Sequence, residues 1–182
     1  RVYGLVDRPL ELTLDDLRRE QPLHQFITLA CISNPPGGDL IGTTRWTGVS
    51  LANVVAGSRP RPEATHAKLS SADGFFELVD LAAAERDRRV MLAYAWDDVP
   101  LTTEHGFPLR LYVPDLYGMK QPKWIDTIEL VNRWAPGYWV QRGWDRDGRM
   151  LAASVVDVAA FDRQGIVLAG GIAHAGARGV SR

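Results

Sequence analysis

The stretch Phe26-Ile-Thr-Leu-Ala-Cys-Ile-Ser-Asn-Pro-Pro-Gly-Gly38 joins an apolar run to a loop rich in proline and glycine. The apolar run predicts a strand, and the single cysteine of the chain, Cys31, comes at its end. We expect this thiol to lie at a sheet edge that faces a cleft. Two interpretations stay open: a thiolate that acts as nucleophile or metal ligand, and a buried thiol that packs as a small hydrophobe.

Composition excludes several classes of protein. The 182 residues carry a formal net charge of −1, which gives no electrostatic basis for binding nucleic acid or an anionic membrane surface. One cysteine cannot form an internal disulfide, and the four histidines lack the paired spacing of a zinc site. No apolar run is long enough to cross a bilayer. The chain begins without Met and in mid-pattern, so we interpret it as a piece of a longer protein.

Mixed α and β structure is expected up to about residue 145. Strands are predicted at 1–6, 26–31, 66–71, 75–79, 89–96, 109–113 and 124–131. Short helices are predicted after three capping residues, Thr13, Ser50 and Asp80. Residues 151–158 and 166–172 are strand-like again, without a helix between them. The predicted fold class is therefore α+β, with a main domain at 1–145 and a β segment at 146–182.

Cations gather on two loops that adjoin one predicted strand. Glu104-His-Gly-Phe-Pro-Leu-Arg110 places His105 and Arg110 where the strand begins, and the loop beyond it carries Lys120 and Lys123. Arginine binds phosphate as a bidentate fork and lysine as a point charge, so these residues form a candidate phosphate site. The alternatives are solvated loop charges, or a Cys–His hydrolase that pairs His105 with Cys31.

Six short motifs follow one another along residues 31–124: Cys31-x-x-Asn34, Thr43-Thr-Arg-Trp-Thr-Gly-Val49, Ser71-Ala-Asp-Gly74, Leu92-Ala-Tyr94, His105-Gly-Phe-Pro-Leu-Arg110 and Lys123-Trp124. In this order they resemble the sulfite oxidase family of molybdopterin oxidoreductases. The resemblance is strongest to bacterial members with a Gly-Asp-Leu-Ile-Gly insert, here residues 38–42. It covers nearly all of residues 1–145 and implies a sulfite-oxidase-like fold of mixed sheets with short helices.

The resemblance implies roles for individual residues. Cys31 matches the thiolate that binds molybdenum, and a soft thiolate suits this metal beside the dithiolene sulfurs of the pterin. Arg45 matches the approach to the metal and Trp144 stands at the substrate-pocket tyrosine, so both are predicted to be catalytic together with Cys31. The residues that match cofactor-binding positions are Cys31, Asn34, Asp73, His105, Arg110, Lys120 and Lys123.

The implied activity is two-electron oxygen-atom transfer to or from a small molecule, with molybdenum–molybdopterin as cofactor. The implied electron partner is a haem protein or a quinone-linked carrier outside this chain. Sulfite oxidases carry a basic pair directly after Cys-x-x-Asn, whereas Pro35 and Pro36 stand here, so sulfite is a poor fit. The alternative is a binding domain that kept the scaffold and lost the metal.

Residues 146–182 resemble the opening strands of the family's immunoglobulin-like dimerisation domain and break off before its second half. A half sandwich leaves unpaired edges, so we expect this segment either to lie against the main domain or to pair with another copy as a homodimer. A cofactor-contacting motif of the family falls before Arg1, so we expect weakened cofactor binding and a domain that can be isolated empty. Localisation is left open, although bacterial members of the family are often membrane-tethered or exported.

Overall fold

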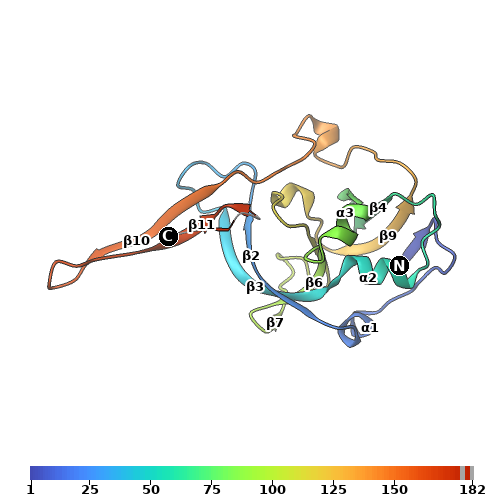
Figure 1. Cartoon of the computed structure of the whole chain (residues 1–182), viewed down its shortest axis with the longest axis horizontal. Coiled ribbons are helices and arrows are strands. Elements are labelled where there is room, and N and C mark those ends of the chain that lie inside the picture. Colours follow the sequence, from blue (N-terminus) through green and yellow to red (C-terminus); the bar gives the residue numbers. More distant parts are fainter. Residues whose placement is uncertain (177–178, 181–182) are drawn as a thin grey trace.

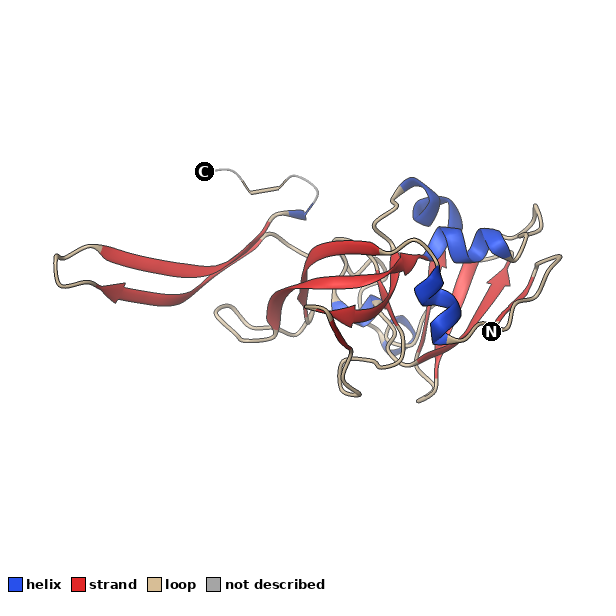
Figure 2. Ribbon diagram, turned by 90° about the horizontal axis from the view of Figure 1, so that it is seen from below, coloured by secondary structure: helices blue, strands red, loops and turns tan. Residues whose placement is uncertain are grey.

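A computed structural model describes residues 1–176 and 179–180, in which two β-sheets share a core and a long hairpin extends from them (Figures 1 and 2). Short helices lie at the end of the molecule opposite the hairpin (Figure 2). Within the described residues, no helix has the length and apolar character needed to cross a membrane. The mixed sheets and short helices confirm the predicted fold class.

The first sheet has four strands in the order β1-β9-β4-β5. The strands are β1 (Val2–Gly4), β4 (His66–Ser71), β5 (Phe76–Asp80) and β9 (Ile125–Val131). Strand β1 runs parallel to β9 and the other pairs are antiparallel. Alternation in β4 buries Ala67 and Leu69 and leaves Lys68 half-buried, as expected for a strand with one face on the core.

The second sheet has five strands, with β2 (Leu23–Ala30), β3 (Ile41–Ser50), β6 (Met91–Trp96) and β7 (Val99–Pro100) in that order and β8 (Arg110–Tyr112) paired to β6. Strand β6 is apolar throughout because both faces of this sheet are covered. Leu92 and Tyr94 join the core between the sheets, whereas Met91 and Ala93 pack on the other face with Ile27 and Trp46.

Strand β3 is the element that the sequence did not predict, because its threonines, glycines and arginine lack a clear apolar alternation. Pairing with β2 on one side and β6 on the other nevertheless makes it a central strand. Gly48 is required there, because a Cβ atom at this position would overlap the Leu92 carbonyl oxygen. The strand runs directly into α2, so it also links the second sheet to the helical layer.

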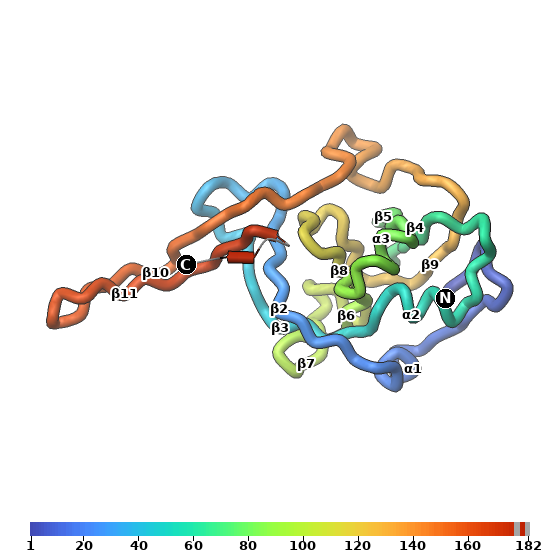
Figure 3. The backbone as a smooth tube through the Cα atoms, viewed as in Figure 1, coloured from blue at the N-terminus to red at the C-terminus, as the bar shows by residue number. Residues whose placement is uncertain are grey.

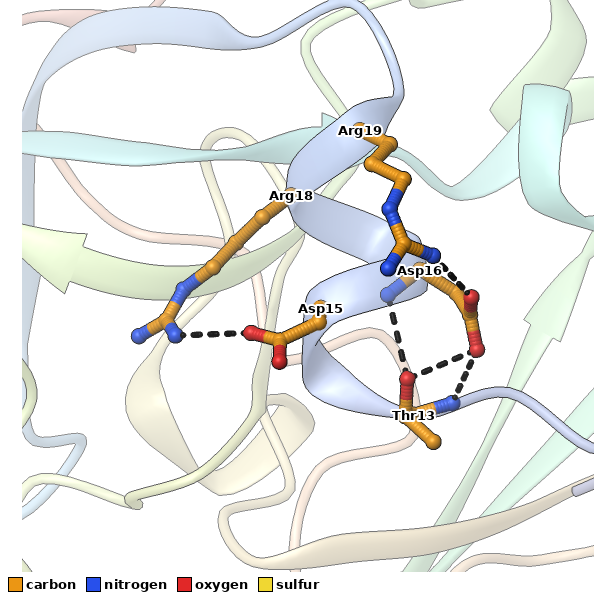
Figure 4. A network of polar contacts seen from close by, with 5 residues as sticks. All are labelled: Thr13, Asp15, Asp16, Arg18 and Arg19. Atoms are coloured by element: carbon orange, nitrogen blue, oxygen red, sulfur yellow. Dashed lines mark hydrogen bonds and ion pairs between the residues drawn. The ribbon is translucent and has the colours of Figure 1, made fainter.

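The three predicted capping residues begin three helices, α1 (Leu14–Arg19), α2 (Leu51–Gly57) and α3 (Leu81–Arg86). Figure 4 shows the cap of α1, where Asp16 N donates to Thr13 Oγ1 at 3.1 Å and Thr13 N donates to Asp16 Oδ2 at 2.9 Å. Hydrogen bonds from the Thr13 side chain and then its backbone N–H lower the pKa of Asp16. These caps confirm a local prediction that needs only residues three apart.

The C-terminal segment forms a two-stranded antiparallel hairpin of β10 (Ala153–Phe161) and β11 (Val167–His174). Figure 3 shows the chain running from β9 past the main body into this hairpin, which points away from it. Its base is tied to the body, where Met150 N donates to Asp115 O at 2.8 Å and Leu151 N donates to the Tyr117 hydroxyl at 3.3 Å. Strands β10 and β11 pair with each other and are largely exposed, and the segment meets the main domain near its base, so the two expected arrangements, packing on the main domain or pairing with another copy, stay predictions.

The immunoglobulin-like interpretation of residues 146–182 and the homodimer stay predictions. The hairpin has the two expected strands, and its side chains are largely exposed, including Val156 and Phe161. Part of the quoted match, residues 177–178 and 181–182, lies outside the described residues.

A buried ion pair ties the first sheet to the loops beyond it. Lys120, at the end of the 3₁₀ helix η1 (Gly118–Lys120), donates from Nζ to Glu77 Oε2 of β5 at 3.0 Å. The two side chains are only 6% and 2% exposed. Gly137 packs against the Glu77 carboxylate, and a Cβ atom at Gly148 would lie 2.8 Å from Lys120 Cγ. The pair therefore supports the 137–148 loop, which contains the 3₁₀ helix η2 (Val140–Arg142).

Breaking this pair on one side should destabilise the fold strongly. Lys120→Met leaves the Glu77 carboxylate buried without its cation, and we expect a loss of about 3–5 kcal/mol in the free energy of unfolding. The double variant Glu77→Leu/Lys120→Met should recover most of the loss, because no charge is then buried. Urea denaturation measures the free energy of unfolding of both variants. Lys68→Met is the control, because the Lys68 ammonium lies over the Phe76 ring. A Lys120→Met protein as stable as the control would contradict the account.

Candidate functional site

Cys31 is exposed and follows the last residue of β2. Its backbone N–H donates to Leu40 O at 2.9 Å, and its Sγ lies 3.1 Å from Ser33 Oγ. The interpretation of Cys31 as a buried, inert thiol is therefore wrong. Among the described residues Ser33 is the thiol's hydrogen-bond partner and His105 is not, so the geometry does not support the Cys–His pair of a hydrolase.

Asn34 shapes the loop that presents this thiol. Its side-chain Oδ1 accepts a hydrogen bond from Leu40 N at 2.9 Å, and its own N–H donates to Cys31 O at 3.1 Å. Gly38 packs against the same side chain. The side chain is thus engaged within its own loop and lies outside the lining of both cavities described next, so Asn34 acts on the site through the loop.

Two cavities meet at Cys31. The larger, of about 630 Å³, brings the thiol together with His105, Arg110 and Lys123, the cations expected at a phosphate site. The smaller, of about 360 Å³, adds Asp73 and the predicted pocket residue Trp144. Both cavities share Cys31, Gly118, Gln121 and Lys123. The structure therefore places the predicted cations and the thiol on one face, which solvated, scattered loop charges would not do.

Backbone pairing sets the cations side by side. Leu111 N donates to Pro122 O at 2.9 Å and Ile125 N donates to Leu109 O at 3.0 Å, so the residue-122 loop runs along β8. Gly106 has a φ of +106°, and a Cβ atom there would lie 3.0 Å from Lys123 Cβ and 3.1 Å from Arg110 Cβ. Glycine at this position therefore lets the turn that carries His105 close onto both cations.

Arg110 is a buried cation without an anion. It is only 5% exposed, its Nη1 donates to His105 O at 3.0 Å, and its guanidinium lies 4.9 Å from the centroid of the Trp46 ring. No ion pair within residues 1–176 and 179–180 includes it. Burial lowers its pKa to about 10. A guanidinium desolvated in this way and facing a cavity favours an anionic ligand.

Lys123 adds to the same positive field, and His105 lies within it. The His105 ring lies 4.1 Å from the Trp96 ring, and its pKa is lowered by burial and then by the charges of Arg110 and Lys123. Lys123 Nζ donates to Glu104 O at 2.7 Å, and burial followed by the Arg110 charge lowers its pKa as well. Burial and the neighbouring charges thus make the protonated forms of His105 and Lys123 less favourable. An anion placed among these side chains would offset this effect.

Two further residues that line the larger cavity, Trp46 and Gln121, were not among the predicted cofactor-binding residues. Trp46 Nε1 and Gln121 Oε1 are buried and have no hydrogen-bond partner among the described residues. One is a donor and the other an acceptor, and because both atoms are shielded from solvent, a ligand in the cavity would reach them only after neighbouring side chains shift. Trp46 stood within a quoted motif, whereas the only signal for Gln121 was its place between two lysines.

Two predicted site residues lie elsewhere. Arg45 pairs with Asp98 in the β6–β7 turn and lies outside the lining of both cavities. Lys120 is buried against Glu77 and its charge is neutralised there. Neither residue lines the two cavities, so the predicted roles of Arg45 at the approach to the metal and of Lys120 at the phosphate stay predictions that the cavity linings do not support.

Residues 1–139 match the family described as the oxidoreductase molybdopterin binding domain. The chain belongs to this family of molybdopterin-binding oxidoreductases. The predicted resemblance to sulfite oxidases is thereby confirmed, and with it molybdopterin as the cofactor that the family binds. The donor set described above fits such a cofactor, because it combines a soft thiolate with unpaired cations.

Individual relatives agree with this assignment. The chain is 31% identical over 151 residues to the "Uncharacterized oxidoreductase YuiH" of Bacillus subtilis (strain 168), covering 81% of this chain and 72% of that protein. It is 28% identical over 156 residues to mitochondrial sulfite oxidase of Rattus norvegicus, covering 73% of this chain and 29% of that protein.

Among solved structures, the sulfane dehydrogenase SoxCD from Paracoccus pantotrophus matches with a TM-score of 0.70 at 21% identity, over 92% of this chain and 43% of that chain. This likeness shows the sulfite-oxidase-like fold. The chain thus spans less than half of the SoxCD chain and less than a third of the rat enzyme.

The crowding of charge around His105 makes a titration prediction. In the cofactor-free domain the His105 pKa should lie below its ordinary 6.5, and Arg110→Met should raise it because one positive neighbour is lost. Since the unfolded chain then binds the proton more readily than the folded one, stability should rise with pH up to about 6.5. NMR of the imidazole C–H signals measures the midpoint. A midpoint above 6.5 that Arg110→Met leaves in place would contradict the site.

Proposed function

We propose that this domain holds a molybdenum–molybdopterin cofactor and serves an oxidoreductase that moves an oxygen atom and two electrons to or from a small molecule. The observation that carries the proposal is the buried guanidinium of Arg110, which has no anion among the described residues and lines the same cavity as the exposed Cys31 thiol. An ordinary fold has no packing use for an unpaired buried cation.

The cations would hold the anionic end of the cofactor. Arg110 has donors free beyond the one bonded to His105 O, and Lys123 has donors beyond the one bonded to Glu104 O. His105, with its lowered pKa, is a neutral ring at pH 7 that can donate or accept one hydrogen bond. After neighbouring side chains shift, Trp46 and Gln121 would orient the flat ring system through the donor and acceptor that they leave unpaired.

Cys31 would be the one protein ligand of the metal. The described residues hold no cluster of three or more His, Cys, Asp or Glu side chains, so the other ligands would belong to the cofactor. Ser33 Oγ, 3.1 Å from the sulfur, can donate to the thiolate and fix its direction. When bound, the cofactor supplies the redox-active metal centre, and the protein supplies position, charge and access.

Electrons must reach or leave this site through another molecule. We propose a haem protein or a quinone-linked carrier as the partner, on the strength of the family resemblance. The substrate is a small molecule that reaches Cys31 through the smaller cavity, because the larger one is the place for the cofactor.

Two variants separate the phosphate site from the metal ligand. In protein produced with active cofactor synthesis, Arg110→Met should lower bound pterin and molybdenum together, by about tenfold or more, since one charged hydrogen bond contributes roughly 1.5–3 kcal/mol. Cys31→Ser should retain pterin and lose oxidoreductase turnover. Fluorescence of the released pterin and metal analysis measure the pterin and molybdenum content of each variant.

Arg61→Met is the matched control, because that side chain is paired with Asp7 on the surface, away from the cavities. A parent protein that takes up neither pterin nor molybdenum under these conditions would instead favour the metal-free binding domain. An Arg110→Met protein with full pterin content would refute the phosphate site.

A further inference from the structure

We propose that the smaller cavity selects an uncharged organic substrate with an apolar body and one polar atom directed at Cys31, in preference to an oxyanion. The inference rests on the proposed function and narrows its substrate class. It starts from the lining of that cavity, here called the aromatic pocket, whose apolar residues are Ile32, Phe75, Met119, Trp124, Trp139 and Trp144.

Three aromatic rings, those of Tyr138, Trp139 and Trp144, pack together as a wall beside the aromatic pocket. Trp139 and Trp144 meet edge to face with centroids 5.9 Å apart, and Tyr138 meets Trp139 in the same way at 5.3 Å. Trp139 and Trp144 are 37% and 41% exposed although they are large and apolar. Paired indoles that stay open to solvent beside a reactive thiol offer flat apolar surface to a ligand, and they would shed water when it binds.

Hydrogen bonds and close packing against the first sheet hold the loop that carries these rings in place. Tyr138 N donates to Phe76 O at 3.1 Å, and Gly137 packs on the buried Glu77 carboxylate of the Glu77–Lys120 pair. Trp144 N donates to Trp139 O at 3.1 Å, which closes the turn around η2 and sets the two indoles against each other. The wall is therefore a preformed surface of the fold.

The pocket carries no surplus positive charge. Its two charged residues, Lys123 and Asp73, have opposite signs, and in the proposed function Lys123 is engaged by the anionic end of the cofactor. Arg142, the nearest candidate for a further cation, donates to Tyr138 O at 2.8 Å and lies 3.6 Å from the centre of the Tyr138 ring, outside the lining. An oxyanion entering here would lose its hydration without gaining a charged partner of its own.

The family pattern suggests two sequence positions that could supply a second cation near the thiol, and neither supplies one here. Pro35 and Pro36 follow the Cys31 loop, and Arg45 is held by Asp98 outside both cavities. The neutral polar side chain that lines the pocket beside the thiol is Ser33. Its hydroxyl can hydrogen-bond one polar atom of a neutral molecule, and this agrees with the charge balance of the pocket.

The volume of the aromatic pocket also favours an organic substrate over an oxyanion. The aromatic pocket has a volume of about 360 Å³, whereas a water molecule occupies about 30 Å³. A four-atom oxyanion would leave most of the indole surface wet, while a molecule with a ring or a short alkyl chain would cover it. Volumes of this order are those of sites for small organic ligands.

A matched pair of ligands tests the inference. Methyl phenyl sulfoxide and benzenesulfinate have the same number of heavy atoms and the same ring, and they differ in charge. Titration calorimetry on the cofactor-loaded domain should show the neutral sulfoxide binding about tenfold or more tightly than the sulfinate. Equal or tighter binding of the sulfinate, or no binding of either ligand, would overturn the proposal.

Variants of the wall make the test specific. Trp144→Ala should weaken sulfoxide binding about tenfold, whereas Trp134→Ala, a tryptophan that stacks on Arg146 outside the aromatic pocket, should leave it unchanged. Trp144→Arg should reverse the preference by adding the missing cation. Circular dichroism confirms that each variant is folded, and a Trp144→Arg protein that still prefers the sulfoxide would count against the charge argument.

Molybdenum and pterin content, measured on the same samples, separates this proposal from the previous one. A domain that binds the sulfoxide selectively but holds no cofactor would refute the proposed oxidoreductase and leave the pocket's selectivity standing. A loaded domain that prefers the sulfinate would refute the substrate class alone.

Discussion

The arrangement of this domain depends on one constraint, a guanidinium buried at Arg110 that has no anion to match it in the part of the chain that the structure describes. Desolvating a cation costs several kcal/mol unless a counter-charge is brought to it. The fold keeps this cation in place with a hydrogen bond to His105 O and the face of Trp46, and it adds Lys123 and His105 nearby. The cavity therefore carries positive charge without a counter-charge among the described residues, and we propose that the phosphate of the cofactor supplies it.

The remainder of the fold serves to bring Cys31 to that cavity. Strands β2 and β8 belong to the second sheet, with β3 and β6 between them, and the larger cavity is lined both by Cys31 after the end of β2 and by Arg110 at the start of β8. The loop closed by Asn34 presents the thiol. The buried Glu77–Lys120 pair anchors the opposite wall, so that indoles and thiol face each other across the smaller cavity. In the proposed function the larger cavity holds the charged end of the cofactor and the smaller one selects the substrate, and Cys31 lines both.

Local chemistry was predictable from the sequence, whereas long-range pairing was not. The caps at Thr13, Ser50 and Asp80 use contacts within three residues, and a short motif places Cys31 at a strand end, so both predictions were confirmed. Strand β3 was missed because its stability comes from neighbours far along the chain. Arg45 and Lys120 lie outside the cavity linings, which the sequence did not show because their partners, Asp98 and Glu77, are 53 and 43 residues away. Gln121 could not be recognised, because an unpaired buried acceptor is a property of the packed structure.

The most direct measurement is a crystal structure of the cofactor-loaded protein with anomalous data collected at the molybdenum edge. The account predicts an anomalous peak bonded to Cys31 Sγ and a phosphate group within hydrogen-bond distance of the Arg110 guanidinium. A metal peak away from Cys31, or a phosphate that leaves Arg110 without an anion, would contradict it.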